Sequence, residues 1–109
     1  MEVNAPQEFF EKVLPGKFKP EKAVGLDVIA QLDIDGPNGG SWVITIREQK
    51  IKVEKGVCPK PMLWAKIEEK AYMDIVNGKL NGEEAFITGK LALKGDLGLA
   101  LKLKKLGFL

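Results

Sequence analysis

The clearest pattern in the chain is an alternation of apolar and polar positions between residues 26 and 34. A period of two is typical of a strand that buries one face. The pattern recurs three times before residue 70, and the first three stretches are joined by short links, which favours an antiparallel meander. The inward positions of the four predicted strands are Leu26, Val28, Ala30, Leu32 and Ile34; Trp42, Ile44 and Ile46; Ile51 and Val53; and Leu63, Ala65 and Ile67.

Helical patterns come before and after these strands. We expect a first helix to begin at Asn4 and to end at Pro15-Gly16, because proline interrupts a helix beyond its first turn. A second helix follows the fourth strand and ends at Asn77-Gly78, two residue types that tolerate the left-handed conformation. Its apolar stripe is Tyr72, Ile75 and Val76.

The last third of the chain predicts three further elements. Asn81 caps a short helix that ends near Gly89, with Glu84 at the spacing of a capping box. Residues 90–94 alternate as a fifth strand. Gly95 then makes a turn, and Asp96 caps a final helix.

The final helix carries more apolar surface than a helix on a globular protein needs. At 100° per residue its apolar side chains fall into two groups on nearly opposite sides, whereas packing on one core requires a single stripe. The helix could be fully buried, bound to a membrane, paired with another chain or placed beside an apolar cavity, and plain burial is the simplest account. The groups are Leu97, Ala100 and Leu101, and Leu99, Leu103 and Leu106.

A chain of 109 residues has the length of a single domain, so we expect one domain over residues 1–109. The N-terminus lacks a signal-peptide pattern, no apolar run approaches a membrane span, and the lone Cys58 excludes an intrachain disulfide, so we expect a cytoplasmic protein. The net charge is +2, and residues 90–109 hold five lysines against one aspartate. These lysines suit the dipole of the final helix, and they could also attract it to an anionic membrane surface.

The residues that the chain lacks exclude most catalytic chemistry. Without histidine there is no Ser–His or Cys–His pair and no imidazole ligand for a metal. No glycine-rich phosphate loop follows a strand, and Arg47 is the only arginine, without a basic patch. We therefore expect no enzyme activity, no metal, no cofactor and no nucleic-acid partner.

Met62 and Trp64 alternate with inward residues of the fourth strand, so both face away from the helices. An exposed tryptophan in an apolar cluster can mark an interface. Two outcomes are equally open. Either a second copy packs here to form a homodimer, or a loop or terminus covers the face.

The motifs of the last third, in their order and spacing, resemble the sterol carrier protein 2 family. Residues 75–80 (Ile-Val-Asn-Gly-Lys-Leu) are followed by Ala85-Phe86, by Gly89-Lys90-Leu91 and by residues 95–103 (Gly-Asp-Leu-Gly-Leu-Ala-Leu-Lys-Leu). The resemblance extends upstream to Trp42-Val43-Ile44 and to residues 18–23, and so covers nearly the whole chain.

This resemblance implies an α+β fold in which helices on one face of a five-stranded sheet enclose an apolar tunnel. It implies non-catalytic binding and transfer of a fatty acid, fatty acyl-CoA, sterol-like molecule or phospholipid. A dimerisation or scaffold module, and an accessory factor that presents a lipid-like intermediate to enzymes, remain as alternatives. The residues expected to line the tunnel are Trp42, Met73, Val76, Leu80, Phe86, Leu97, Leu101 and Phe108.

Two departures from the family pattern bear on these expectations. The chain ends Gly107-Phe108-Leu109 instead of in a peroxisomal tripeptide, so we do not expect a peroxisomal protein. Lys104 stands where the family often has an uncharged polar residue. There it is either a solvated lysine or a cation at the tunnel mouth that favours an anionic headgroup. We expect the final helix to be the gate of the tunnel, with the short helix Gly82–Thr88 as the alternative.

Overall fold

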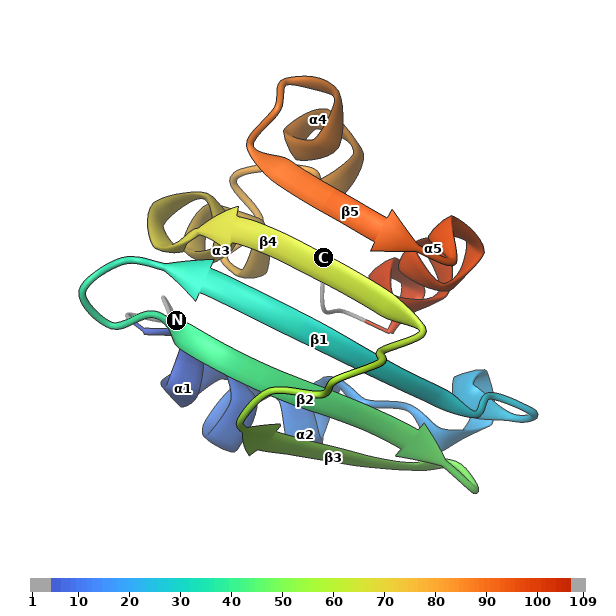
Figure 1. Cartoon of the computed structure of the whole chain (residues 1–109). Helices are drawn as coiled ribbons and strands as arrows, with labels where there is room; N and C mark the ends of the chain where they lie inside the picture. Colours follow the sequence, from blue (N-terminus) through green and yellow to red (C-terminus); the bar gives the residue numbers. More distant parts are fainter. Residues whose placement is uncertain (1–4, 107–109) are drawn as a thin grey trace.

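The computed structural model describes residues 5–106, which form a five-stranded mixed sheet with helices on one face (Figure 1). The strand order is β3-β2-β1-β4-β5, with β1 and β4 parallel and the other pairs antiparallel. The strands are β1 (Val28–Asp35), β2 (Gly40–Arg47), β3 (Lys50–Lys55), β4 (Leu63–Glu68) and β5 (Leu91–Gly95). The helical elements are α1 (Pro6–Glu8), η1 (Phe9–Val13), α2 (Leu14–Lys17), η2 (Pro20–Ala23), α3 (Glu69–Val76), α4 (Gly82–Ile87) and α5 (Leu97–Lys105).

The alternation in the sequence sets the inner face of the sheet, as predicted. Every second residue of β1, from Val28 to Ile34, is buried, and the inward residues of β2 and β4 are buried as well. Those of β3 are only partly buried. The meander of the first three strands is confirmed. The α+β fold with a five-stranded sheet and helices on one face is therefore correct.

The first helix differs from the prediction at its C-terminal end. It begins at Pro6, close to the expected start, but it passes through Pro15-Gly16 and ends at Lys17. The middle of this helix is a π turn in which the N–H of Leu14 bonds to the carbonyl of Phe9. This wider turn restarts the α-helix at Leu14, so Pro15 lies in a first turn, where its missing N–H costs nothing.

An aromatic cluster fills the core between the first helix, α3 and the sheet. The rings of Phe10 and Trp42 lie 5.2 Å apart between centroids, and those of Phe9 and Tyr72 lie 6.2 Å apart. Edge-to-face and tilted pairs at such distances are favourable beyond the area they bury. Trp42 is therefore part of a closed core, on the inner face of β2.

The connection between β3 and β4 crosses the outer face of the sheet, because β4 returns to lie beside β1 (Figure 1). Gln31 of β1 is buried beneath it. Its amide donates to the carbonyl of Gly56 at 3.1 Å, and its oxygen accepts from the N–H of Cys58 at 2.6 Å. A loop thus covers part of the face that the sequence left open. Within the described residues, no helix is both long and apolar enough to cross a bilayer.

Candidate functional site

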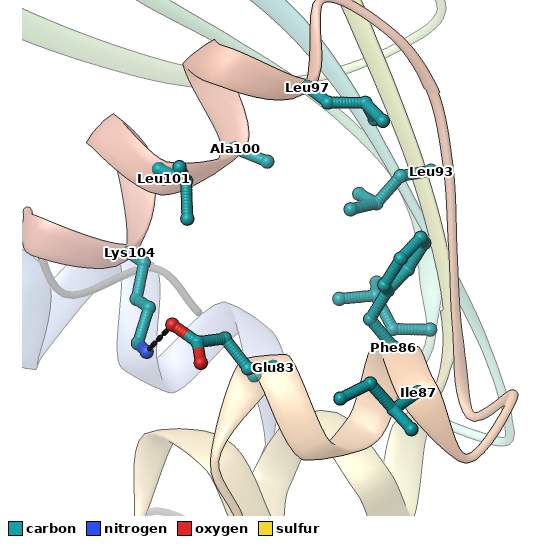
Figure 2. Close-up of a pocket in the computed structure, with 10 residues that line it drawn as sticks. Glu83, Phe86, Ile87, Leu93, Leu97, Ala100, Leu101 and Lys104 are labelled. Atoms are coloured by element: carbon teal, nitrogen blue, oxygen red, sulfur yellow. Dashed lines mark hydrogen bonds and ion pairs between the residues drawn. The ribbon is translucent and has the colours of Figure 1, made fainter.

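An open groove lies between α4 and α5, above the inner face of β5 (Figure 2). Its volume is about 310 Å³, at the lower end of the range for small-molecule pockets. We call it the α4–α5 groove. Its walls are Gly82, Glu83, Phe86, Ile87, Leu91, Leu93, Leu97, Ala100, Leu101 and Lys104.

The two apolar stripes of α5 have different neighbours. Leu99 and Leu103 are 6% and 3% exposed and belong to the core. Leu97 and Leu101 are 50% and 55% exposed and face the groove. Of the second stripe predicted from the sequence, Leu97 and Leu101 therefore form a wall of the groove, while Ala100 is buried where the groove meets the core.

The start of α5 is fixed by local hydrogen bonds. The Asp96 carboxylate accepts from the N–H of Gly98 at 2.9 Å, which confirms the predicted cap. The N–H of Asp96 itself donates to the carbonyl of Met62 at 2.9 Å. This second bond ties the N-cap of α5 to Met62, the residue before β4.

The opposite wall of the groove is α4, which is short and capped at both ends. The predicted Asn81 cap is present, and its side-chain oxygen accepts from the N–H of Glu83 at 2.8 Å. Gly89 closes the helix with φ of +81°. Ala85 packs fully into the core, while Phe86 is 45% exposed along the groove. The floor comes from β5, where Leu91 is buried and Leu93 is half-buried.

One ion pair connects the two walls. The ammonium of Lys104 on α5 lies 2.7 Å from a carboxylate oxygen of Glu83 on α4. The hydrogen bond from Lys104, followed by its charge, holds the pKa of Glu83 below its ordinary value. These two side chains are the only charged groups among the lining residues; the others are apolar or glycine.

Three of the residues expected to line a tunnel come together in this groove: Phe86, Leu97 and Leu101. Trp42 and Val76 are buried in the core, and Met73 and Leu80 pack against it half-buried; none of these four lines the groove. Phe108 lies outside the described residues. An enclosed tunnel, with these five residues in its wall, stays a prediction.

Several lining residues were not among the expected ones. Leu93 could have been included, because its alternation with Leu91 already places it on the inner face of β5. Ile87 follows Phe86 directly and is 81% exposed. Glu83 had no signal at all, because its partner is 21 positions away in the sequence.

Comparison with known proteins matches the chain to one protein family and to segments of longer curated proteins. Residues 4–107 match the profile of the SCP-2 sterol transfer family. A hydroxysteroid dehydrogenase-like protein 2 from Xenopus laevis is 32% identical over 101 residues, which are 92% of this chain and 24% of that protein. The chain spans about a quarter or less of the length of the first curated relatives that it matches.

Two solved structures show the same fold. The sec-alkylsulfatase Pisa1 from Pseudomonas sp. has a TM-score of 0.76 and 24% identity, over 94% of this chain and 16% of that enzyme. Palmitated SCP2L2 from Aedes aegypti has a TM-score of 0.71 and 24% identity, over 94% of this chain and 93% of that protein. At these identities the likeness establishes the arrangement of the sheet and helices.

Proposed function

Because the chain belongs to the SCP-2 sterol transfer family, we propose that it binds a long-chain lipid in the α4–α5 groove and transfers it between lipid surfaces without catalysis. The ligand class is a fatty acid, fatty acyl-CoA, sterol-like molecule or phospholipid. The palmitated state of the Aedes aegypti protein supports a single acyl chain as the shared element. We place this exchange in the cytoplasm.

The observation that carries this proposal is the apolar surface exposed around the groove. Phe86, Leu97 and Leu101 are each about half exposed, and Phe86 on α4 lies across a cavity of about 310 Å³ from Leu97 and Leu101 on α5. Apolar area gains about 25 cal/mol per Å² when it leaves water, and each buried methylene of a ligand gains about 0.8 kcal/mol. An acyl chain in the groove removes apolar surface from water on both partners.

The groove has a volume at the lower end of the range for small-molecule pockets, and the other residues expected to line a tunnel lie outside it. We propose that the groove is the entrance, and that the remaining expected lining residues form the deeper part of a tunnel that opens as the chain enters. Met73 suits such a wall, because its unbranched side chain repacks readily. The residues assigned to the deeper part are Trp42, Met73, Val76, Leu80 and Phe108.

The direct test is native mass spectrometry of the protein purified from its own cells, together with displacement of a fluorescent long-chain fatty acid. We expect a retained lipid, and competition by unlabelled fatty acid. Phe86→Asp should abolish binding, because it places a charge in the apolar wall. Val57→Asp is the matched control, since Val57 is 74% exposed and does not line the groove. If a folded Phe86→Asp variant binds the fatty acid normally, Phe86 is not part of the binding site.

A second candidate is presentation of a lipid-like intermediate to a catalytic unit. It is favoured by the lengths of the relatives, because the matched segment is only 16% of the alkylsulfatase chain and 24% of the Xenopus laevis protein. A transfer assay between donor and acceptor vesicles separates the two roles. A carrier moves labelled lipid by itself, whereas a presenting domain binds lipid but transfers it only when its enzyme is added.

The scaffold alternative, a homodimer through the outer sheet face, stays a prediction. Met62 is 45% exposed there, and Trp64 is partly buried. Sedimentation velocity measures it directly: a dimer that Trp64→Lys converts to a monomer, with lipid binding intact, supports the interface. A wild-type monomer at high concentration contradicts it.

A further inference from the structure

The Glu83–Lys104 pair closes one end of the α4–α5 groove (Figure 2). Leu97 lies at the other end, seven residues before Lys104 on the same helix, which corresponds to roughly 10 Å. The stretch between them is apolar. A groove with one charged end and an apolar remainder has the chemical pattern of an amphiphile with a single headgroup.

The side chain of Lys104 is less exposed than those of Lys52 and Lys66, two other lysines that form ion pairs. Its side chain is 32% exposed, compared with 70% for Lys52 and 50% for Lys66. The methylene stem of a lysine can cover apolar surface while its ammonium reaches a partner. The ammonium of Lys104 is therefore held at the groove end, with its stem along the groove wall and its head paired with Glu83.

We propose that Lys104 binds the carboxylate of a fatty acid and selects it over neutral lipids, and that Glu83 takes the place of this carboxylate while the groove is empty. This assignment rests on the proposed lipid-binding function. The head of the ligand lies at Lys104, the first part of its chain runs along α5 toward Leu97, and the remainder enters the deeper part proposed above. The carboxylate of Glu83 occupies the position of the headgroup in this structure, because it is the same chemical group bound to the same ammonium.

Glu83 then acts as an internal competitor. A fatty acid must displace it from Lys104, after which Glu83 turns into water, where its side chain is already 62% exposed. A neutral lipid has no group that replaces the ion pair, so the pair stays closed while such a lipid occupies the apolar part. Glu83 is ionised at neutral pH, as any glutamate with an ordinary or lowered pKa is, so this competitor is charged while the groove is empty. Lys104 thus provides selectivity for an anion, and Glu83 limits the affinity.

The test compares dodecanoic acid with dodecanol, which share a chain and differ in the charge of the head. Lys104→Met should weaken the binding of dodecanoic acid by about three- to tenfold, which is the range of a partly exposed charge-assisted contact. The affinity for dodecanol should change by less than about twofold. Lys105→Met is the matched control, because Lys105 is on the same helix, carries the same charge and is exposed outside the groove.

The role of Glu83 as a competitor is tested by Glu83→Gln, which should tighten the binding of dodecanoic acid by about two- to fivefold and leave the affinity for dodecanol unchanged. Glu84→Gln removes the same charge from the next residue, which does not line the groove. This control should change the affinity for neither ligand. Carbon NMR of carboxyl-labelled dodecanoic acid adds a readout that packing alone does not move. The bound carboxyl should titrate at lower pH in the wild type than in Lys104→Met, because a cation favours its ionised form.

Three results overturn the assignment. If Lys104→Met binds dodecanoic acid as well as the wild type does, or if it loses the same affinity for both ligands, Lys104 does not recognise the headgroup. Lipid binding in the groove is unaffected by that result. If Glu83→Gln weakens dodecanoic acid, Glu83 supports the site instead of competing for it. If neither ligand binds the wild-type protein, the proposed function fails together with this inference.

Discussion

The indole Nε1 of Trp64 donates a hydrogen bond to the carboxylate of Asp33 at 2.7 Å, between the parallel strands β4 and β1. The register places Trp64 beside Gln31, so Asp33 is its diagonal neighbour on the face away from the helices. The ammonium of Lys94 lies 5.3 Å from the centroid of the Trp64 ring. Trp64 therefore points outward, as its alternation with the inward residues predicts, and it has polar partners within its own chain.

This hydrogen bond makes the stability of the sheet sensitive to acid. Burial alone would raise the pKa of Asp33, but hydrogen bonds from Trp64, Ser41 and Gln31 outweigh it and hold this pKa below its ordinary value. A carboxyl with a lowered folded-state pKa stabilises the fold above its unfolded-state pKa of about 3.9, and this stability is lost as the pH falls through the folded-state value. We expect the free energy of unfolding, measured with urea, to fall below about pH 4.

Trp64→Phe isolates the contribution of the Trp64–Asp33 hydrogen bond to stability. It should lower the free energy of unfolding at neutral pH by about 1.5 kcal/mol, the low end for a lost hydrogen bond to a charged group, because the pair is only partly buried. It should also make the remaining acid dependence less steep, since the pKa of Asp33 moves back toward its ordinary value. An unchanged pH profile in the variant would show that other carboxyls dominate acid unfolding.

The hydroxyl of Tyr72 is buried and has no hydrogen-bond partner among the described residues. Burial raises the pKa of Tyr72 far above its ordinary value, so the group is neutral at every physiological pH. A buried polar group without a partner costs about 1–3 kcal/mol. Tyr72→Phe keeps the ring between Phe9 and Phe10 and should therefore increase the free energy of unfolding by about 1 kcal/mol.

The control for this prediction is Tyr72→Ala, which removes the ring as well. It should destabilise the protein by about 3–5 kcal/mol through the cavity that it leaves. Both values come from urea unfolding. A clear loss of stability in Tyr72→Phe contradicts the prediction, because it means that the hydroxyl is bonded in solution.

Local patterns in the sequence were sufficient for the elements and for the unusual character of α5. One-sided burial imposes a period of two on a strand, so the buried face of β1, from Val28 to Ile34, could be assigned before any tertiary contact was known. The same reasoning separated the two stripes of α5. That separation left plain burial as the simplest account of both stripes, and only the family resemblance assigned Leu97 and Leu101 to the wall of a cavity, where the structure places them.

The features that the sequence patterns did not predict depend on which residues, distant in the sequence, come into contact in the fold. Trp42 and Val76 are as apolar as Leu97, and periodicity does not distinguish a core residue from the wall of a cavity. The position of the β3–β4 connection over Gln31 follows from the order of the strands, which the meander alone left undetermined. The π turn before Pro15 has no side-chain cap, so no capping motif in the sequence marks it.

Membrane contact through α5 predicts that the charge of the vesicle affects lipid uptake. Lys102 and Lys105 are exposed on the same helix as the half-exposed Leu97 and Leu101. Each lysine near an anionic surface contributes on the order of 1 kcal/mol. We expect faster uptake of a fluorescent fatty acid from anionic than from neutral vesicles, and added salt should remove the difference by screening.

The variant Lys102→Glu/Lys105→Glu should lose this preference. The matched control is Lys50→Glu/Lys60→Glu, which makes the same change in net charge away from the groove, on the far edge strand β3 and on the β3–β4 connection. Equal uptake from both vesicle types by the wild-type protein contradicts membrane contact through these lysines, and the lysines then serve the helix dipole and solubility.

Opening of the groove predicts a change in hydrogen exchange that is confined to its walls. Gly95, with φ of +103°, precedes α5, and Gly98 lies within it, and glycine permits backbone motion at low cost. Because Asp96 is bonded to Gly98 and to Met62, this end of α5 is the pivot and the later turns of the helix are the part that moves. Gates come from the least stable part of a fold. We expect the amides of Leu99 to Leu106 to exchange faster in the empty protein than in the protein loaded with dodecanoic acid, and faster still in empty Glu83→Gln, which lacks the ion pair to α4.

The internal reference for this measurement is β1, which lies at the centre of the sheet and is buried on its inner face. Its amides should exchange at the same slow rate in the empty protein, the loaded protein and the Glu83→Gln variant. If only the amides of Gly82–Ile87 respond to the ligand, α4 is the moving wall and α5 is fixed. If neither helix responds, lipid enters the groove as it stands, because both walls already keep it open to solvent in the empty protein.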